Sequence, residues 1–239
     1  IGGWGFHGCS KLKSINIPKN VEEIGQRAFA DCSKLSTITV DEKNEHFKSV
    51  DNTLFTKDGK KLIRYAPAKT ETSYIIPDGV AVIDKSAFEE CSHLESIRIP
   101  DSVTTIEDFA FNTCSSLKTV NIPESVKTIG TATFQKCSSL TSIIIPNNVT
   151  KIGEYAFFDC SSLTSITILN SVTTIGGRAF SSCSSLTSIT VPNSITTIGY
   201  WAFSFCSSLT TATLPKRFEN QKNDIFLCCD NLKTINWTE

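Results

Sequence analysis

A 23-residue periodicity runs through the chain and constrains its fold more than any other feature. Cysteine marks the period at Cys9, Cys32, Cys91, Cys114, Cys137, Cys160, Cys183, Cys206 and Cys229. A phenylalanine precedes each of these cysteines by three residues, and a leucine follows each by three. Self-similarity at a fixed period of this length predicts a solenoid, in which every repeat forms one coil and stacks on its neighbours.

The pattern inside one repeat predicts a strand followed by turns. Ile143 and Ile145 alternate with outward positions, which is the period of a half-buried strand. Pro146 ends that strand because its nitrogen has no hydrogen to donate. Val149 and Ile152 are expected to turn inward again before short turns or helical turns close the coil. Strands that recur once per coil are parallel, about 4.8 Å apart, and their connections are right-handed.

The segment 41–71 breaks this rhythm and carries 13 charged residues in 31. Two short apolar runs, 53–56 and 61–65, flank Asp58-Gly59, which is a hairpin signal. We therefore expect one solenoid domain over 1–239, with about ten strand rungs and an inserted hairpin within 41–71. The last repeat, 216–239, loses its isoleucine, glycine and alanine columns, as a capping unit would. The chain begins in the middle of a repeat, so we expect a preceding part in the full protein.

The repeats resemble a known family. The stretches 122–130 (IPESVKTIG) and 156–166 (AFFDCSSLTSI) are similar to the 23-residue BspA-like leucine-rich repeat, and 54–65 (LFTKDGKKLIRY) is similar to a hairpin segment common in that family. The resemblance covers essentially the whole chain. It implies a curved right-handed solenoid with a parallel β-sheet on the concave face. It also implies a secreted or cell-surface location, often in adhesins, and no catalytic residues.

Catalytic, metal and cofactor sites are not expected. Stacked cysteines would hold their Cβ atoms about 4.8 Å apart, beyond the roughly 3.5–4.5 Å that a disulfide needs, so buried free thiols are the favoured interpretation. Sporadic pairing, for example at Cys228 and Cys229, is the alternative. Only His7 lies near a cysteine that it could activate, and no metal-ligand or phosphate-loop motif is present.

Charge and hydropathy exclude two classes of partner. The net charge is −1, from 23 Lys and Arg against 24 Asp and Glu, so no bulk attraction to nucleic acid is expected. No apolar stretch is long enough for a transmembrane helix. We expect a monomer that binds no cofactor.

The outward strand positions form the first candidate binding surface. Every rung begins with an outward serine or threonine. If the inward isoleucines are assigned correctly, the exposed sheet is a nearly uncharged hydroxyl face, varied by an arginine and isoleucines. Its candidate residues are Ser96, Arg98, Thr119, Asn121, Ser142, Ile144, Ser165, Thr167, Ser188 and Thr190. Stabilisation of the sheet by cross-strand hydroxyl pairs is an equally good explanation.

Aromatic residues outside the phenylalanine column form a second candidate patch. They are Tyr155, Phe158, Tyr200, Trp201 and Phe205, at positions that are mostly polar or small in other repeats. Filling gaps on the convex side is the favoured interpretation, and an interaction site is the alternative.

Three hypotheses for function follow. The leading one is a non-enzymatic surface or secreted protein that binds a host or neighbouring-cell protein or glycan. The second is a structural spacer within a larger surface protein. A minor third is an ice- or crystal-binding hydroxyl face, which requires a flat and uninterrupted sheet.

Overall fold

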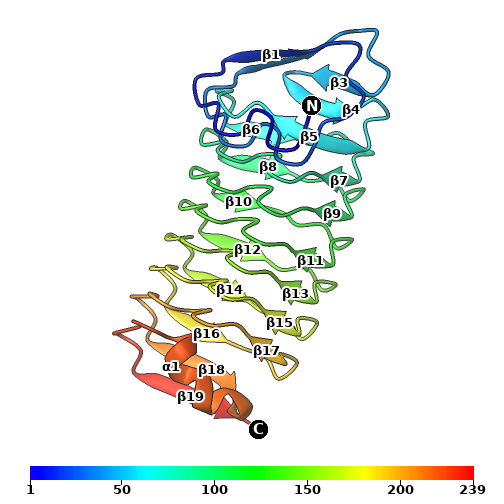
Figure 1. The fold of residues 1–239 in the computed structure, drawn as a ribbon. Helices are drawn as coiled ribbons and strands as arrows, with labels where there is room; N and C mark the ends of the chain where they lie inside the picture. Colours follow the sequence, from blue (N-terminus) through cyan, green and yellow to red (C-terminus); the bar gives the residue numbers. More distant parts are fainter.

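The computed structural model describes residues 1–239 and shows an elongated stack of coils, from β1 at one end to β19 at the other (Figure 1). Each coil contributes one strand to a first side of the stack. Before the insert and again after it, neighbouring strands are parallel with a register shift of 23 residues, as for Ser142 beside Ser165. No pairing connects the strands on the two sides of the insert. The ten strands are β1 Ser14–Ile17, β2 Thr37–Val40, β6 Ser73–Ile75, β8 Ser96–Arg98, β10 Thr119–Val120, β12 Ser142–Ile144, β14 Ser165–Thr167, β16 Ser188–Thr190, β18 Thr211–Pro215 and β19 Thr234–Thr238. The predicted parallel solenoid with ten rungs is confirmed.

A second parallel sheet lies along another side of the coils, where the sequence indicated only an inward turn. Its strands have two residues each: β7 Val82–Ile83, β9 Thr105–Ile106, β11 Thr128–Ile129, β13 Lys151–Ile152, β15 Thr174–Ile175 and β17 Thr197–Ile198. In each pair the isoleucine points inward and is buried. In the six coils that contain these strands, two strands therefore enclose the core from two sides (Figure 1).

The insert forms an antiparallel hairpin that joins this second sheet. Strands β4 (Thr53–Thr56) and β5 (Lys61–Tyr65) pair antiparallel, and a further strand, β3 (Phe47–Val50), adds to β4. Gly59 has a φ of 75°, the left-handed conformation that such a turn requires. On its other side β5 pairs parallel with β7, so it supplies the rung that the interrupted repeat lacks.

Both faces of the hairpin are buried, against two different clusters of side chains. Successive residues of a strand point to opposite faces. Leu54 and Ala66 accordingly pack into a nine-residue cluster with the first two coils, whereas Phe55, Leu62 and Tyr65 pack into a 54-residue cluster with all later coils. The hairpin thus forms a wall between two cores. The assignment of 1–239 to one domain stays a prediction.

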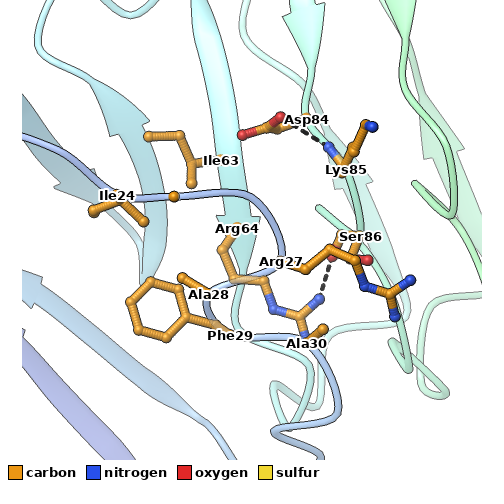
Figure 2. A pocket seen from close by; sticks show the side chains of 11 residues that line it. Ile24, Arg27, Ala28, Phe29, Ala30, Ile63, Arg64, Asp84, Lys85 and Ser86 are labelled. Atoms are coloured by element: carbon orange, nitrogen blue, oxygen red, sulfur yellow. Dashed lines mark hydrogen bonds between the residues drawn. The ribbon is translucent and has the colours of Figure 1, made fainter. Parts of the chain in front are cut away.

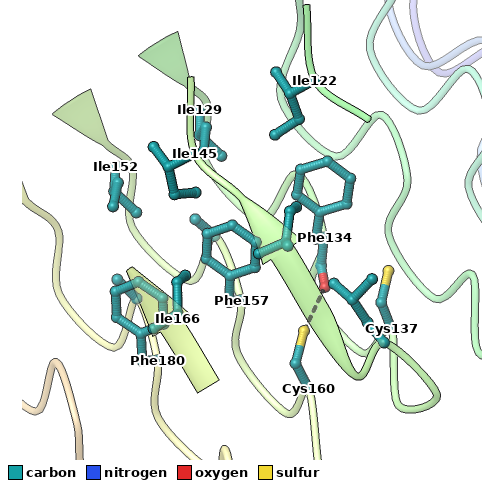
Figure 3. Close-up of a cluster of buried hydrophobic side chains, with 14 of the residues drawn as sticks. Ile122, Ile129, Phe134, Cys137, Ile145, Ile152, Phe157, Cys160, Ile166 and Phe180 are labelled. Atoms are coloured by element: carbon teal, nitrogen blue, oxygen red, sulfur yellow. Dashed lines mark hydrogen bonds between the residues drawn. The ribbon is translucent and has the colours of Figure 1, made fainter. Parts of the chain in front are cut away.

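The phenylalanine column forms a continuous ring stack in the larger core. Neighbouring rings from Phe88 to Phe203 lie 5.1–5.5 Å apart with nearly parallel planes (Figure 3). Tyr65 of the hairpin takes the phenylalanine position at the head of the column, 5.4 Å from Phe88, and Phe226 closes it. Offset stacking of this kind adds about 0.5–1.5 kcal/mol per pair to the stabilisation from burial.

The cysteine column is buried beside these rings. The Cys160 thiol donates a hydrogen bond to the carbonyl oxygen of Phe134, 3.1 Å away, and the thiols of Cys137 and Cys183 donate in the same way to phenylalanine carbonyls at 3.3 Å (Figure 3). Burial raises the pKa of Cys137 and of Cys183 from 9.0 to about 12. All ten cysteines are free, and the favoured interpretation of buried thiols is confirmed for seven of them.

Turns, rather than helix, complete each coil. Alternate amides in this segment donate to carbonyls of the next coil, as Tyr155 does to Gly177 at 3.0 Å and Phe157 to Ala179 at 2.7 Å. Two positions per coil adopt a positive φ, and they are seldom glycine: Tyr155, Arg178 and Trp201 have φ values of 54–60°. An L-residue in this conformation is uncommon, because its Cβ approaches the carbonyl oxygen.

The last coil departs from the pattern, as expected for 216–239. A 3-10 helix, η1 (Lys216–Gln221), continues into a short helix, α1 (Lys222–Ile225), before β19. Phe218 and Ile225 are buried against the end of the larger core. None of the helices has the length and apolarity that crossing a membrane would require.

Candidate binding surfaces

The hydroxyl face, defined as the outward side chains of β8 to β16 in the first sheet, is exposed as predicted. Ser96, Thr119, Ser142, Ser165 and Ser188 are all exposed, and their hydroxyls make no hydrogen bond within the protein. Threonines elsewhere in the coils behave differently. For example, the Thr173 hydroxyl donates to the Thr150 carbonyl at 3.2 Å, and Thr196 repeats this contact one coil later.

The second outward position of the hydroxyl face is more varied. Ile144 is 82% exposed, and Arg98 has no carboxylate within ion-pair distance. Asn121 instead completes the sheet, since its amide nitrogen donates to the Ile99 carbonyl at 3.0 Å and its oxygen accepts from the Ile99 amide at 3.3 Å. Thr167 and Thr190 are exposed. The outcome is a weakly charged surface with unpaired hydroxyls, one cation and one exposed aliphatic side chain.

This face is not an unbroken lattice. Hydrogen bonds connect β6, β8 and β10, then β12 and β14, then β16, β18 and β19, with interruptions between these groups. Arg98 and Ile144 also replace hydroxyl positions. An ice- or crystal-binding surface depends on regular spacing, so the interruptions remove the basis of that hypothesis.

The predicted aromatic residues come together around an arginine that the sequence analysis did not select. We call Tyr155, Phe158, Arg178, Tyr200, Trp201 and Phe205 the aromatic–arginine cluster. Tyr155, Arg178 and Trp201 occupy the same left-handed position in three successive coils. Arg178 Nη1 donates to the Tyr155 hydroxyl at 2.8 Å, and its guanidinium lies 4.3 Å above the Trp201 ring. The 23-residue spacing from Tyr155 and Trp201 could have identified Arg178.

Much of the aromatic surface in this cluster faces solvent. Tyr200 is 76% exposed, Phe205 53% and Trp201 37%. Tyr155 and Phe158 pack edge to face, with ring centroids 5.7 Å apart. Gap filling therefore explains the inner rings but leaves the outer three without a packing role.

Two shallow depressions flank the centre of the cluster. One, of about 330 Å³, lies between Glu154, Tyr155 and Tyr200, and the other, of about 360 Å³, is bounded by Ser182, Phe205 and Leu227. Arg178 and Trp201 form part of both. The two depressions therefore share one cation and one indole ring.

A buried cavity at the hairpin wall is too small to be a ligand site. It lies between Arg27, Arg64 and Ser86 and has a volume of about 10 Å³, the space of one water molecule (Figure 2). The Arg64 guanidinium, which is 2% exposed, donates to the Ser86 carbonyl, and Arg27 forms an ion pair with buried Glu89 at 3.1 Å. These charged groups belong to the junction between the two cores.

The positions of the cysteines and histidines do not indicate a nucleophilic or metal-binding site. His7 lies 3.2 Å from Asp31 and so pairs with a carboxylate rather than with a thiol. Cys137, Cys160 and Cys183 are buried and burial raises their pKa values, whereas a nucleophilic cysteine needs an accessible thiolate. No group of three or more His, Cys, Asp or Glu side chains is arranged to hold a metal ion.

Comparison with known proteins agrees with the repeat pattern. The BspA type leucine-rich repeat region matches in six copies, over residues 1–71, 61–168 and 150–239. No curated protein matches significantly.

Solved structures give the same picture. The chain is similar to a leucine-rich repeat protein from Eubacterium ventriosum (29% identity over 84% of this chain and 60% of that one, TM-score 0.67). It is also similar to a leucine-rich cell surface protein from Faecalibacterium prausnitzii (29% identity, 95% and 48%, TM-score 0.60). The pneumococcal vaccine antigen PcpA shares the fold (24% identity, 95% and 56%, TM-score 0.77). The chain thus spans about half to three fifths of these structures.

Proposed function

Because this chain belongs to the BspA-type leucine-rich repeat family, we propose that it is part of a surface or secreted protein that binds a host or neighbouring-cell macromolecule. The family's solenoid is typically non-catalytic, and similarity to a leucine-rich cell surface protein supports a surface-type role. The proposed partner is a protein or a glycan, bound by a monomer without a cofactor.

The hydroxyl face carries this proposal. Five successive rungs present hydroxyls that the protein does not use, and Ile144 adds an aliphatic side chain that is 82% exposed among them. An exposed apolar side chain gains about 25 cal/mol for each Å² that a partner covers, whereas unpaired hydroxyls supply directional hydrogen bonds at the same interface. A weakly charged surface of this kind suits a neutral partner.

A matched pair of substitutions tests the face. The full chain is assayed by surface plasmon resonance against extracellular-matrix proteins, glycans and cells, as wild type, Ile144→Asp and Val50→Asp. Val50 is a comparable control, because it is also an aliphatic strand residue, 49% exposed, but lies on the hairpin. Loss of binding in Ile144→Asp alone supports the face, whereas equal binding by all three proteins contradicts it.

The second candidate function is a structural spacer. The regular ring stack and the coil-to-coil hydrogen bonds favour it, since a continuous core makes a stiff rod whether or not its surface binds anything. A spacer binds none of the partners tested, and its removal shortens the display distance of a neighbouring domain. Measurement of that distance in a full-length surface protein separates the two functions.

A further inference from the structure

We propose that the aromatic–arginine cluster is a second binding site, for a saccharide that bears a carboxylate. This site lies on the turn side of the coils, away from the hydroxyl face, and its existence does not depend on the function proposed for that face. Three properties of the cluster support it: exposed ring faces, an unneutralised guanidinium that is already oriented, and a depression on either side.

The exposed rings provide a stacking platform. The C–H face of a pyranose ring is apolar and flat, and it covers aromatic surface without leaving a polar group unpaired. Tyr200 and Phe205 are each more than half exposed, so their rings are available for this contact. Trp201 and Phe205 have φ values of 60° and 55°. Coils throughout the solenoid have two such left-handed positions, so the repeat sets this conformation and it is not itself a sign of a site.

Arg178 gives the site its charge preference. Its guanidinium has no carboxylate within ion-pair distance, although the side chain is held between Trp201 at 4.3 Å and the Tyr155 hydroxyl at 2.8 Å. A guanidinium with free N–H groups in a fixed orientation binds a carboxylate through two parallel hydrogen bonds. Little side-chain entropy remains to be lost on binding, because the orientation is already fixed.

A similar arrangement near the other end of the solenoid has its arginine already paired with a carboxylate. Arg27 lies at the equivalent repeat position, 4.8 Å from Trp4 and 4.4 Å from Phe109. Its charge is neutralised by the carboxylate of Glu89 at 3.1 Å. Arg178 lacks this internal anion, so the cluster around it is complete only when a ligand supplies a carboxylate.

The surroundings favour a sugar over a peptide. The backbone amides of Tyr155, Arg178 and Trp201 already donate to the next coil at 2.9–3.0 Å, so no free strand edge is available to pair with a peptide backbone. Recognition must therefore use side chains. Glu154 on one side and Ser182 on the other can bond to sugar hydroxyls, and the depressions of about 330 and 360 Å³ can each take one sugar unit.

Calorimetry on the full chain tests the proposal with matched ligands. Sialyllactose and trigalacturonate carry carboxylates, and lactose is the neutral control. We expect binding of at least one acidic ligand, weakened by salt, with lactose at least tenfold weaker, because a hydrogen bond between two charged groups is stronger than one between neutral groups. Absence of acidic-sugar binding, or equal binding of lactose, overturns the proposal.

Variants locate the binding. Arg178→Gln and Tyr200→Ala are expected to lower the affinity about tenfold or more. Trp4→Ala, which truncates the residue equivalent to Trp201 near the other end, should leave the affinity unchanged. Tyr200 is 76% exposed, so its truncation leaves the fold intact, and thermal unfolding verifies this. Unchanged affinity in Arg178→Gln overturns the site even if the sugar binds. Ile144→Asp should not affect sugar binding, which separates this test from that of the hydroxyl face.

Discussion

Gly176→Ala should destabilise the solenoid, although its neighbour Gly177→Ala should not. A Cβ on Gly176 would lie 2.5 Å from the Glu154 nitrogen and from the Gly153 carbonyl carbon, both of which are backbone atoms of the preceding coil. A Cβ on Gly177 would meet only the Tyr200 backbone, at 3.4 Å and beyond. Neither glycine has a left-handed φ, so alanine's own backbone preference is not the difference.

The magnitude follows from opposing contributions. Alanine restricts the unfolded chain more than glycine does, which favours folding by about 0.4–1 kcal/mol at both positions. At Gly177 nothing opposes this gain. At Gly176 the coils must separate by nearly 1 Å, which costs about 1–3 kcal/mol as overpacking. Separation also weakens the bond from the Gly176 amide to the Ile152 carbonyl, 2.8 Å long, by up to about 1 kcal/mol. The two variants should therefore differ by about 1–4 kcal/mol.

Urea unfolding followed by circular dichroism measures this difference. A third variant, Gly130→Ala, tests whether backbone contact is the cause. Gly130 occupies the same repeat position as Gly176, but a Cβ there would closely meet only the Asp108 side chain, at 2.6 Å. The nearest backbone atom would lie 3.4 Å away. A side chain can move aside, so a mild effect is expected. Glu107 at the same position one coil earlier shows that a larger residue is tolerated there. Equal midpoints for Gly176→Ala and Gly177→Ala would refute the argument that backbone contact sets the coil spacing.

Three further predictions concern the core and the junction. Burial raises the pKa values of Cys137 and Cys183 to about 12, so these thiols ionise at lower pH in the unfolded chain than in the folded one. The free energy of unfolding is therefore unaffected below about pH 9 and falls between pH 9 and pH 12, by about 1.4 kcal/mol per pH unit for each thiol. The double serine variant should show a shallower decline in urea titrations at pH 8–11, and an unchanged slope would contradict this. Phe157→Ala removes a fully buried ring from the middle of the stack and should lower stability by about 3–5 kcal/mol, with an unfolding curve that splits as the two halves uncouple; a small loss without broadening would argue against a continuous core. Arg27→Ala leaves the Glu89 carboxylate, 1% exposed, without its cation, and should cost about 3–5 kcal/mol in the same assay, of which Glu89→Gln in that background recovers part; no recovery would show that lost packing dominates.

Repetition explains why so much of the fold was predictable. A weak local signal such as the alternation around Ile143 recurs in phase with the cysteine and phenylalanine columns, so each repeat corroborates the others. The hairpin was predictable for a different reason, since Asp58-Gly59 between two apolar runs is a strong local turn signal.

The elements that the sequence did not reveal have physical reasons as well. Two-residue strands such as β13 are too short to show a period of two, so the second sheet was not predicted. Tyr65 completes the ring stack from inside the insert; the count of 23 fails from Phe29 but leads back to Tyr65 from Phe88, and tyrosine in place of phenylalanine concealed the match. The left-handed positions were hidden because residues such as Trp201 occupy them, whereas the usual signal for a positive φ is glycine.

The candidate surfaces were predictable to different degrees. Outward strand positions such as Ser142 follow directly from the alternation, and the structure finds them exposed. Whether their hydroxyls were satisfied could not be deduced, because that depends on side-chain rotamers. Arg178 was missed because a polar residue in a turn carries no signal by itself, although its 23-residue spacing from Tyr155 and Trp201 places it in their column.

The hairpin wall also bears on how such a chain can change in length. Beyond the hairpin, every coil offers its successor the same ring, thiol and backbone contacts, so duplication or loss of a 23-residue unit there recreates the junction that it interrupts. The coil that packs on the N-terminal side of the hairpin has no such freedom, since Leu54 and Ala66 on one face of the hairpin close its core. The hairpin is therefore a fixed element, and recombination can adjust the reach of the array only between coils that do not contact it.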